Sequence, residues 1–102
     1  MADRIIVYWR DMPAQVIVKA GRKSAKRQLP ERFEQAIDMA AMRAGKRDTD
    51  SYLAEWRKGE PEPVEGDDLE AIADREASRL ESDYAPERMK ALIANGGVEP
   101  AA

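Results

Sequence analysis

The sequence predicts a single small α+β domain in which an N-terminal antiparallel β-hairpin packs with about four helices. Three observations predict this fold class. Two β-branched apolar runs lie close together near the N-terminus, helical periodicity dominates the remainder, and 102 residues suffice for one hydrophobic core. We expect the domain to span residues 1–95 and a flexible C-terminal tail to cover residues 96–102.

The hairpin is predicted from two strand-like runs joined by the turn-like segment DMPAQ. These runs are IIVYW at residues 5–9 and VIV at residues 16–18. Strict alternation places Ile5, Val7 and Trp9 on one face and Ile6 and Tyr8 on the other, so both faces carry apolar side chains. One face should pack on the helices. The other is left for later segments of the chain or for a second subunit, so a homodimer is one alternative.

Helix start and stop signals predict four helices after the hairpin. Proline fits a first helical turn, Asp and Thr cap N-termini, and glycine ends helices. The predicted helices run over residues 31–44, from Asp48 or Thr49 to Gly59, from Asp67 to about Ser82, and from Pro86 to Asn95. Residues 59–66, which mix proline and glycine with glutamate, are expected to form an exposed acidic loop.

The composition excludes several classes of chemistry. The chain contains no cysteine and no histidine, which removes disulfides, thiol nucleophiles, imidazole bases and the usual zinc ligands. The acidic residues of the loop do not match a calcium-binding loop. We therefore name no catalytic residue, no metal ligand and no cofactor, and we favour a protein without enzymatic activity. With no apolar run of membrane-spanning length and no signal segment, the predicted location is the cytoplasm and no membrane partner is expected.

Charge is distributed unevenly along the chain. Residues 1–58 carry 13 Lys and Arg against 8 Asp and Glu, whereas residues 59–102 carry 4 against 12. The two halves can attract each other within one fold, or the basic half can bind an anionic partner. We favour the first interpretation, and the second remains open.

The basic segment GRKSAKR is the predicted contact site for a partner or an anion. Its candidate binding residues are Arg22, Lys23, Ser24, Lys26 and Arg27. Ammonium and guanidinium groups pair with anionic oxygens, so phosphate contact is physically reasonable. The segment matches neither a P-loop nor a dinucleotide-binding loop. Nucleic acid is the less favoured partner because the sequence pI is about 5.1.

Two methionines extend the candidate interaction surface. On a helical wheel, Met39 and Met42 lie away from the apolar face of the first predicted helix. Methionine more often completes a core than serves a partner, so a helix contacted on two sides is the favoured interpretation. As the alternative, these methionines join Tyr8 and Arg10 in a surface that binds a partner.

Several strings resemble a known family. VYWRDMPAQV, GRKSAKR and YLAEW are similar to the small bacterial proteins labelled virulence factor, a domain that also occurs in larger proteins of the conserved virulence factor C type. The resemblance covers most of residues 3–95. It implies an accessory protein, because stand-alone members often occur near genes of folate-linked and corrinoid-dependent one-carbon metabolism. It implies no catalytic residues.

The sequence supports two main hypotheses for function. In the first, a non-catalytic accessory protein docks on another protein, an enzyme, through the hairpin, GRKSAKR and the two methionines. In the second, GRKSAKR binds a polyanion, either nucleic acid or a phosphorylated or polyglutamylated cofactor. A third and least favoured hypothesis is an enzyme that uses Tyr8 or Lys26 as a proton donor, which requires converging polar groups.

Overall fold

Five strands and four helices make up the described part of the chain and confirm the α+β class. The computed structural model describes residues 2–46 and 48–99. The strands are β1 (Ala2–Trp9), β2 (Met12–Ala20), β3 (Lys23–Gln28), β4 (Trp56–Lys58) and β5 (Glu62–Val64). The helices are α1 (Glu31–Arg43), α2 (Thr49–Ala54), α3 (Leu69–Asp83) and α4 (Pro86–Ala94).

All strand pairs of the sheet are antiparallel. Its order is β3-β2-β1-β4, and β5 pairs with a different stretch of β1 from the one that β4 uses. The predicted hairpin of β1 and β2 is present, but its turn is shorter than DMPAQ. Trp9 pairs with Met12, so only two residues form the turn, and the strand register shifts where Ala14 forms a bulge in β2.

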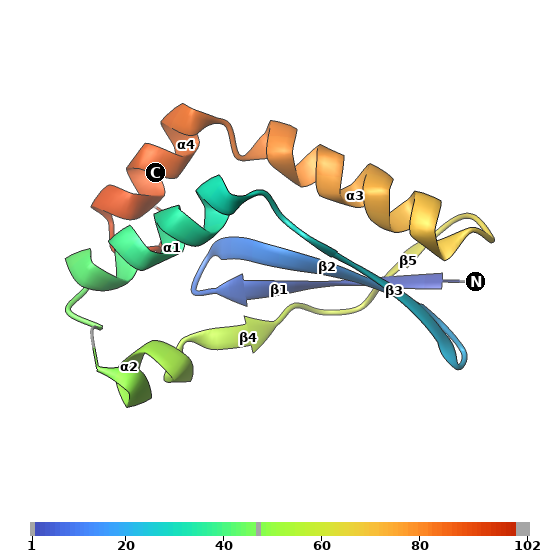
Figure 1. The fold of residues 1–102 in the computed structure, drawn as a ribbon, viewed down its shortest axis with the longest axis horizontal. Coiled ribbons are helices and arrows are strands. Elements are labelled where there is room, and N and C mark those ends of the chain that lie inside the picture. Colours follow the sequence, from blue (N-terminus) through green and yellow to red (C-terminus); the bar gives the residue numbers. More distant parts are fainter. Residues whose placement is uncertain (1, 47, 100–102) are drawn as a thin grey trace.

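α1, α3 and α4 lie on one side of the sheet, whereas α2 lies apart from them beside β4 (Figure 1). α3 packs on β2 and β3, whereas α1 packs against α4 over the end of the sheet where the β1–β2 turn lies. The core between the layers contains both sheet and helix side chains. Its largest fully buried members are Trp9, Phe33, Met12, Ile37, Leu92, Val16 and Val18.

Three segments of the chain have a different secondary structure from the one that the sequence indicated. The second helix ends at Ala54, because Trp56–Lys58 pairs with β1 as β4 instead of continuing the helix. Residues 59–66 are largely exposed, yet Glu62–Val64 pairs with β1 as β5. GRKSAKR, to which no element was assigned from the sequence, mostly forms β3.

Residues 96–99 pack against the β1–β2 turn instead of starting a free tail. Gly96 and Gly97 are buried, and the Asp11 amide donates a hydrogen bond to the Gly97 carbonyl at 2.9 Å. The Glu99 amide donates to the Asp11 carboxylate at 2.7 Å. These residues therefore belong to the folded domain, and residues 100–102 of the predicted tail lie outside the described residues.

Ion pairs between the two halves of the sequence confirm that they attract each other within the fold. Arg4 of β1 pairs with the buried Glu76 of α3 at 2.7 Å and with Glu62 of β5. Arg27 of β3 pairs with Glu70 and Asp74 of α3. The charge asymmetry of the sequence thus serves in part to hold α3 on the sheet.

Candidate functional site

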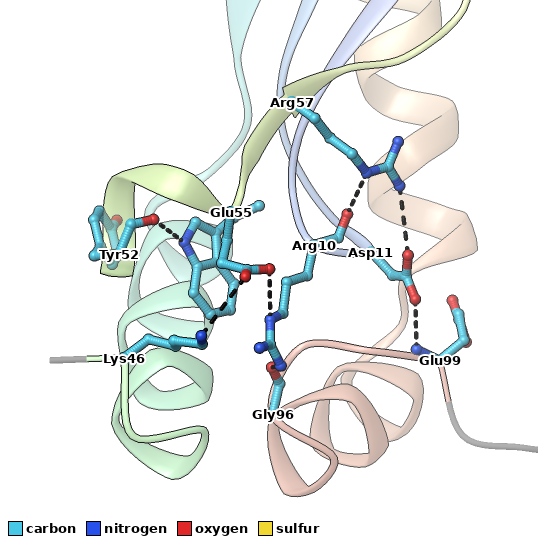
Figure 2. A network of polar contacts seen from close by, with 9 residues as sticks. Arg10, Asp11, Lys46, Tyr52, Glu55, Arg57, Gly96 and Glu99 are labelled. Carbon is cyan, nitrogen blue, oxygen red and sulfur yellow. Dashed lines mark hydrogen bonds and ion pairs between the residues drawn. The ribbon is translucent and has the colours of Figure 1, made fainter. Parts of the chain in front are cut away.

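The β1–β2 turn contacts both residues 55–57 and residues 96–99, and Arg10 lies at its centre (Figure 2). Arg10 has a φ of +54°, a strained value for a bulky residue. Its guanidinium donates to the Glu55 carboxylate at 2.9 Å and to the Gly96 carbonyl at 3.0 Å. Its own carbonyl accepts a hydrogen bond from Arg57 at 3.0 Å. Arg10, predicted as an interaction residue, is therefore engaged within the domain.

Trp9 is enclosed beside this turn. Its indole N–H donates to the Tyr52 carbonyl at 2.9 Å, and its ring stacks on Tyr52 with the ring centres 5.8 Å apart. The Arg10 guanidinium lies 5.5 Å from the centre of the Trp9 ring. A Cβ added to Gly97, whose φ is +90°, would lie 2.7 Å from the indole. The turn, α2 and the segment after α4 thus meet at one tryptophan.

Tyr8 lines a cleft of about 370 Å³ between the β4–β5 edge of the sheet and the end of α3. Arg57 lies over the Tyr8 ring at 4.5 Å. The cleft walls carry both signs of charge, with Arg4 and Arg57 beside Asp11, Glu60, Glu62 and Glu99. This mixture gives the cleft no clear preference for an anion. Tyr8 and Lys26 lie on opposite faces of the sheet by strand register, so they do not converge as proton donors.

Tyr84 forms another wall of this cleft. Its burial predicts that the domain loses stability at alkaline pH. Burial raises the pKa of the Tyr84 phenol above its ordinary value of 10. The folded state therefore keeps this proton at a pH where the unfolded chain loses it. Stability from this residue is fully present below about pH 10 and is lost as the pH rises further. We expect Tyr84→Phe to show a smaller fall in Tm than the wild type between pH 9 and 11 in thermal melts. An unchanged fall would contradict this assignment.

GRKSAKR lies at the opposite end of the hairpin from Arg10. Gly21 and Arg22 form the two-residue β2–β3 turn, and Gly21 adopts a φ of +61°, as the first central residue of such turns often does. β2 spans nine residues, so the two turns lie about 26 Å apart. The predicted site residues therefore form separate surfaces.

Strand alternation also divides GRKSAKR itself between two faces. Ser24 pairs with Lys19 and Lys26 pairs with Ile17, whereas Arg27 pairs with Val16 on the helix-covered face. Arg27 contacts α3, and hydrogen bonds to Asp74 and, to a smaller extent, Glu70 raise its pKa. Arg22, Lys23, Ser24 and Lys26 are exposed.

The sheet face away from α3 carries an aliphatic stripe outside the hydrophobic core. Ile5 pairs with Ile17, and Val7 lies on the same face as Ile5. Ile5 and Val7 are half-buried and Ile17 is 5% exposed, yet none of the three belongs to the core cluster. By register, seven polar side chains share their face. We call this surface the open face: Asp3, Ile5, Val7, Gln15, Ile17, Lys19, Ser24, Lys26, Gln28 and Lys58.

The two methionines are exposed on α1. Met39 is 47% exposed and Met42 is 56% exposed, so the favoured interpretation that these methionines complete the core is wrong. α1 contacts both β2 and α4, but with other side chains. Met42 lines a shallow hollow with Asp38, Lys46 and Tyr52. This hollow is separate from GRKSAKR.

One protein-family model matches most of the chain. The family model described as virulence factor matches residues 7–93. The chain belongs to the virulence factor family. No curated protein and no solved structure matches it.

The virulence factor match begins at Val7 on the open face and contains most of the β1–β2 hairpin, all of β3 and most of α4. Gly96, Gly97 and Glu99, which contact the turn, lie after its last residue. Among the described residues of this virulence factor domain, no group of three acidic side chains is arranged to hold a metal ion. Within the same ranges, no helix has the length and apolarity needed to cross a membrane.

Sequence reasoning missed part of the surface of this virulence factor domain. Lys19 and Lys58 were not among the candidate residues, although both lie on the open face by strand register. The alternation along residues 5–9 did indicate a second apolar face besides the one that packs on the helices. Lys19 follows the second run directly and could have been found from the same alternation, whereas Lys58 required knowledge of β4.

Proposed function

We propose that this virulence factor protein is a non-catalytic interaction module that docks the open face of its sheet on an acidic surface of a partner protein. The aliphatic stripe of Ile5, Val7 and Ile17 is the observation that carries the proposal. Ile17 is 5% exposed, whereas Ile5 and Val7 are half-buried and lie outside the core, so the stability of the core does not explain the apolar character of these two. An apolar centre with a polar rim is the usual anatomy of a protein interface.

The charges around the stripe define the chemistry of the partner. Lys19, Lys26 and Lys58 are exposed on this face, and Asp3, which pairs with Lys19, is the acidic residue beside them in β1. Rim lysines steer association and orient a partner of opposite charge, whereas the apolar centre supplies affinity. Salt should therefore weaken docking mainly through slower association.

The alternative of a polyanion site in GRKSAKR receives less support. A phosphate cradle needs several donors aimed at one point. Here Lys26 and Arg27 lie on opposite faces of β3, and Arg27 is already paired with Glu70 and Asp74. The family resemblance instead suggests an enzyme of folate- or corrinoid-linked one-carbon metabolism as the first partner to test.

Site-specific photocrosslinking in bacterial cells tests the proposal. A photoreactive amino acid replaces Lys58 on the open face, and Lys90 on α4 in a second sample. We expect one discrete protein adduct from position 58 and none from position 90. Val7→Glu should abolish that adduct, because it places a carboxylate on the stripe facing an acidic partner.

Val98→Glu is the matched control, since Val98 is 40% exposed and its neighbours Gly97 and Glu99 contact Asp11 of the β1–β2 turn. It introduces the same charge and should leave the adduct unchanged. Circular dichroism should show that both variants keep the fold, because neither residue belongs to the core cluster. Equal adducts from both crosslinking positions, or adducts with nucleic acid alone, would contradict docking through the open face.

A further inference from the structure

The two edges of the sheet differ in their protection against an added strand. The β4–β5 edge consists of two three-residue strands separated by residues 59–61, and Pro63 lies within β5. Short strands, interruptions and proline are devices that block strand addition. β3, at the other edge, has six residues, contains no proline and pairs with β2 in an uninterrupted register.

The backbone of β3 offers hydrogen-bonding groups along this edge. In an antiparallel ladder, every second residue directs its N–H and C=O away from the paired strand. Lys26 is such a residue, because its carbonyl accepts a hydrogen bond from Arg27 Nη1 at 2.8 Å instead of closing the ladder. The alternation assigns the same outward direction to Ser24 and Gln28. Both residues are exposed.

The side chains of β3 determine which strand this edge can accept. A second copy that pairs β3 with β3 would bring Lys23, Lys26 and Arg27 close to their own equivalents, and like charges on neighbouring strands repel. On the open face, an added strand would instead lie beside Lys26 and near Lys19. On the covered face it would lie beside Arg27 and the carboxylates of Glu70 and Asp74.

We infer that β3 accepts an extended segment of the partner protein whose acidic side chains alternate with small or apolar ones. Its acidic side chains would lie on the open face, against Lys26, and the intervening residues would lie beneath α3. The lysines that prevent self-association then also select the partner. This inference rests on the proposed function, because the added strand would extend the surface that docks.

Amide hydrogen exchange of the full-length, isotope-labelled protein tests the inference. The probe is a capped heptapeptide with the sequence TEVEVET at millimolar concentration, and the control peptide is TKVKVKT. We expect TEVEVET to slow exchange of the Ser24, Lys26 and Gln28 amides by about tenfold or more, because strand pairing protects them. TKVKVKT should leave exchange unchanged. Chemical-shift changes without this alternating protection, or protection at β4 or β5, would overturn the inference.

Two variants of Lys26 distinguish the contribution of its backbone N–H to strand addition from that of its side-chain charge. Lys26→Pro removes an outward N–H that the ladder does not use, so it should eliminate the protection at Ser24 and Gln28. Lys26→Ala keeps the N–H and should retain the protection with an affinity lowered several-fold. Equal behaviour of the two variants would overturn strand addition.

The hydrogen-exchange experiment on β3 and the crosslinking experiment at position 58 can fail independently of each other. If TEVEVET leaves β3 unprotected while the adduct from position 58 persists, strand addition is wrong and docking through the open face stands. If β3 is protected while the adduct is absent, strand addition stands and docking through the stripe is wrong.

Discussion

Trp9→Ala is expected to lower the free energy of unfolding by about 3–5 kcal/mol, the usual loss for a large aromatic residue removed from a core. Trp9 is fully buried, stacks on Tyr52 and donates a hydrogen bond to its carbonyl. Domains of this size have total stabilities of about 5–15 kcal/mol, so the variant should be close to unfolding. Chemical denaturation followed by circular dichroism measures the loss.

Trp56→Ala is the matched control for this prediction. Trp56 is only half-buried and contacts the edge of the Tyr52 ring with ring centres 6.0 Å apart, so its removal should cost clearly less. Trp9→Phe should retain much of the apolar contact but leave the Tyr52 carbonyl without its donor, at a cost of about 1–3 kcal/mol. Equal losses for Trp9→Ala and Trp56→Ala would refute the prediction that Trp9 stabilises the fold more than Trp56 does.

Glu76→Ala should lower the free energy of unfolding by about 3 kcal/mol, at the lower end of the range for breaking a buried ion pair. The Glu76 side chain is 4% exposed and that of Arg4 is 18% exposed, so the variant leaves a poorly hydrated guanidinium beneath α3. Arg4 Nε is already buried without a hydrogen-bond partner. Glu62 still faces Arg4 and limits the loss.

A double variant identifies the origin of that loss. Arg4→Met combined with Glu76→Leu removes both charges and keeps apolar volume, and it should recover most of the stability lost in Glu76→Ala. Glu62→Ala, which removes the exposed partner, should cost less than about 1 kcal/mol. If the double variant were less stable than Glu76→Ala, the unpaired guanidinium of Arg4 would not be the cause of the loss in Glu76→Ala.

The elements with strong periodicity could be predicted from the sequence. The first two strands were found from their β-branched residues, and three helices were found within one or two residues at most ends because proline, capping residues and glycine mark them. β3 was missed because KSAKRQ has only one apolar residue, Ala25, which is buried beneath α3. Its conformation depends on pairing with β2 and on packing that a local pattern does not encode. β4 and β5 are too short to leave a pattern.

The candidate site could be predicted only in part for a related reason. Alternation along residues 5–9 placed Trp9 on one face with Ile5 and Val7. Tyr52 and Gly97 cover Trp9, which belongs to the core, whereas Ile5 and Val7 lie outside it. Which part of a face is covered therefore depends on tertiary packing. Arg27 looked available in the sequence because its partners, Glu70 and Asp74, lie more than 40 residues away. Arg10 looked available for the same reason. Charged residues near one another in sequence therefore did not predict a shared surface.

The contacts between the β1–β2 turn and residues 96–99 place a constraint on folding during synthesis. Glu99 follows Asp11 by 88 residues, yet its amide binds the Asp11 carboxylate. At about 5–20 residues per second, the ribosome adds that stretch in about 4–18 seconds. Throughout that interval the hairpin exists without the segment that closes over Trp9. We therefore expect the enclosure of the indole to be completed only after Gly97 has been synthesised, although Tyr52 can stack on the indole earlier.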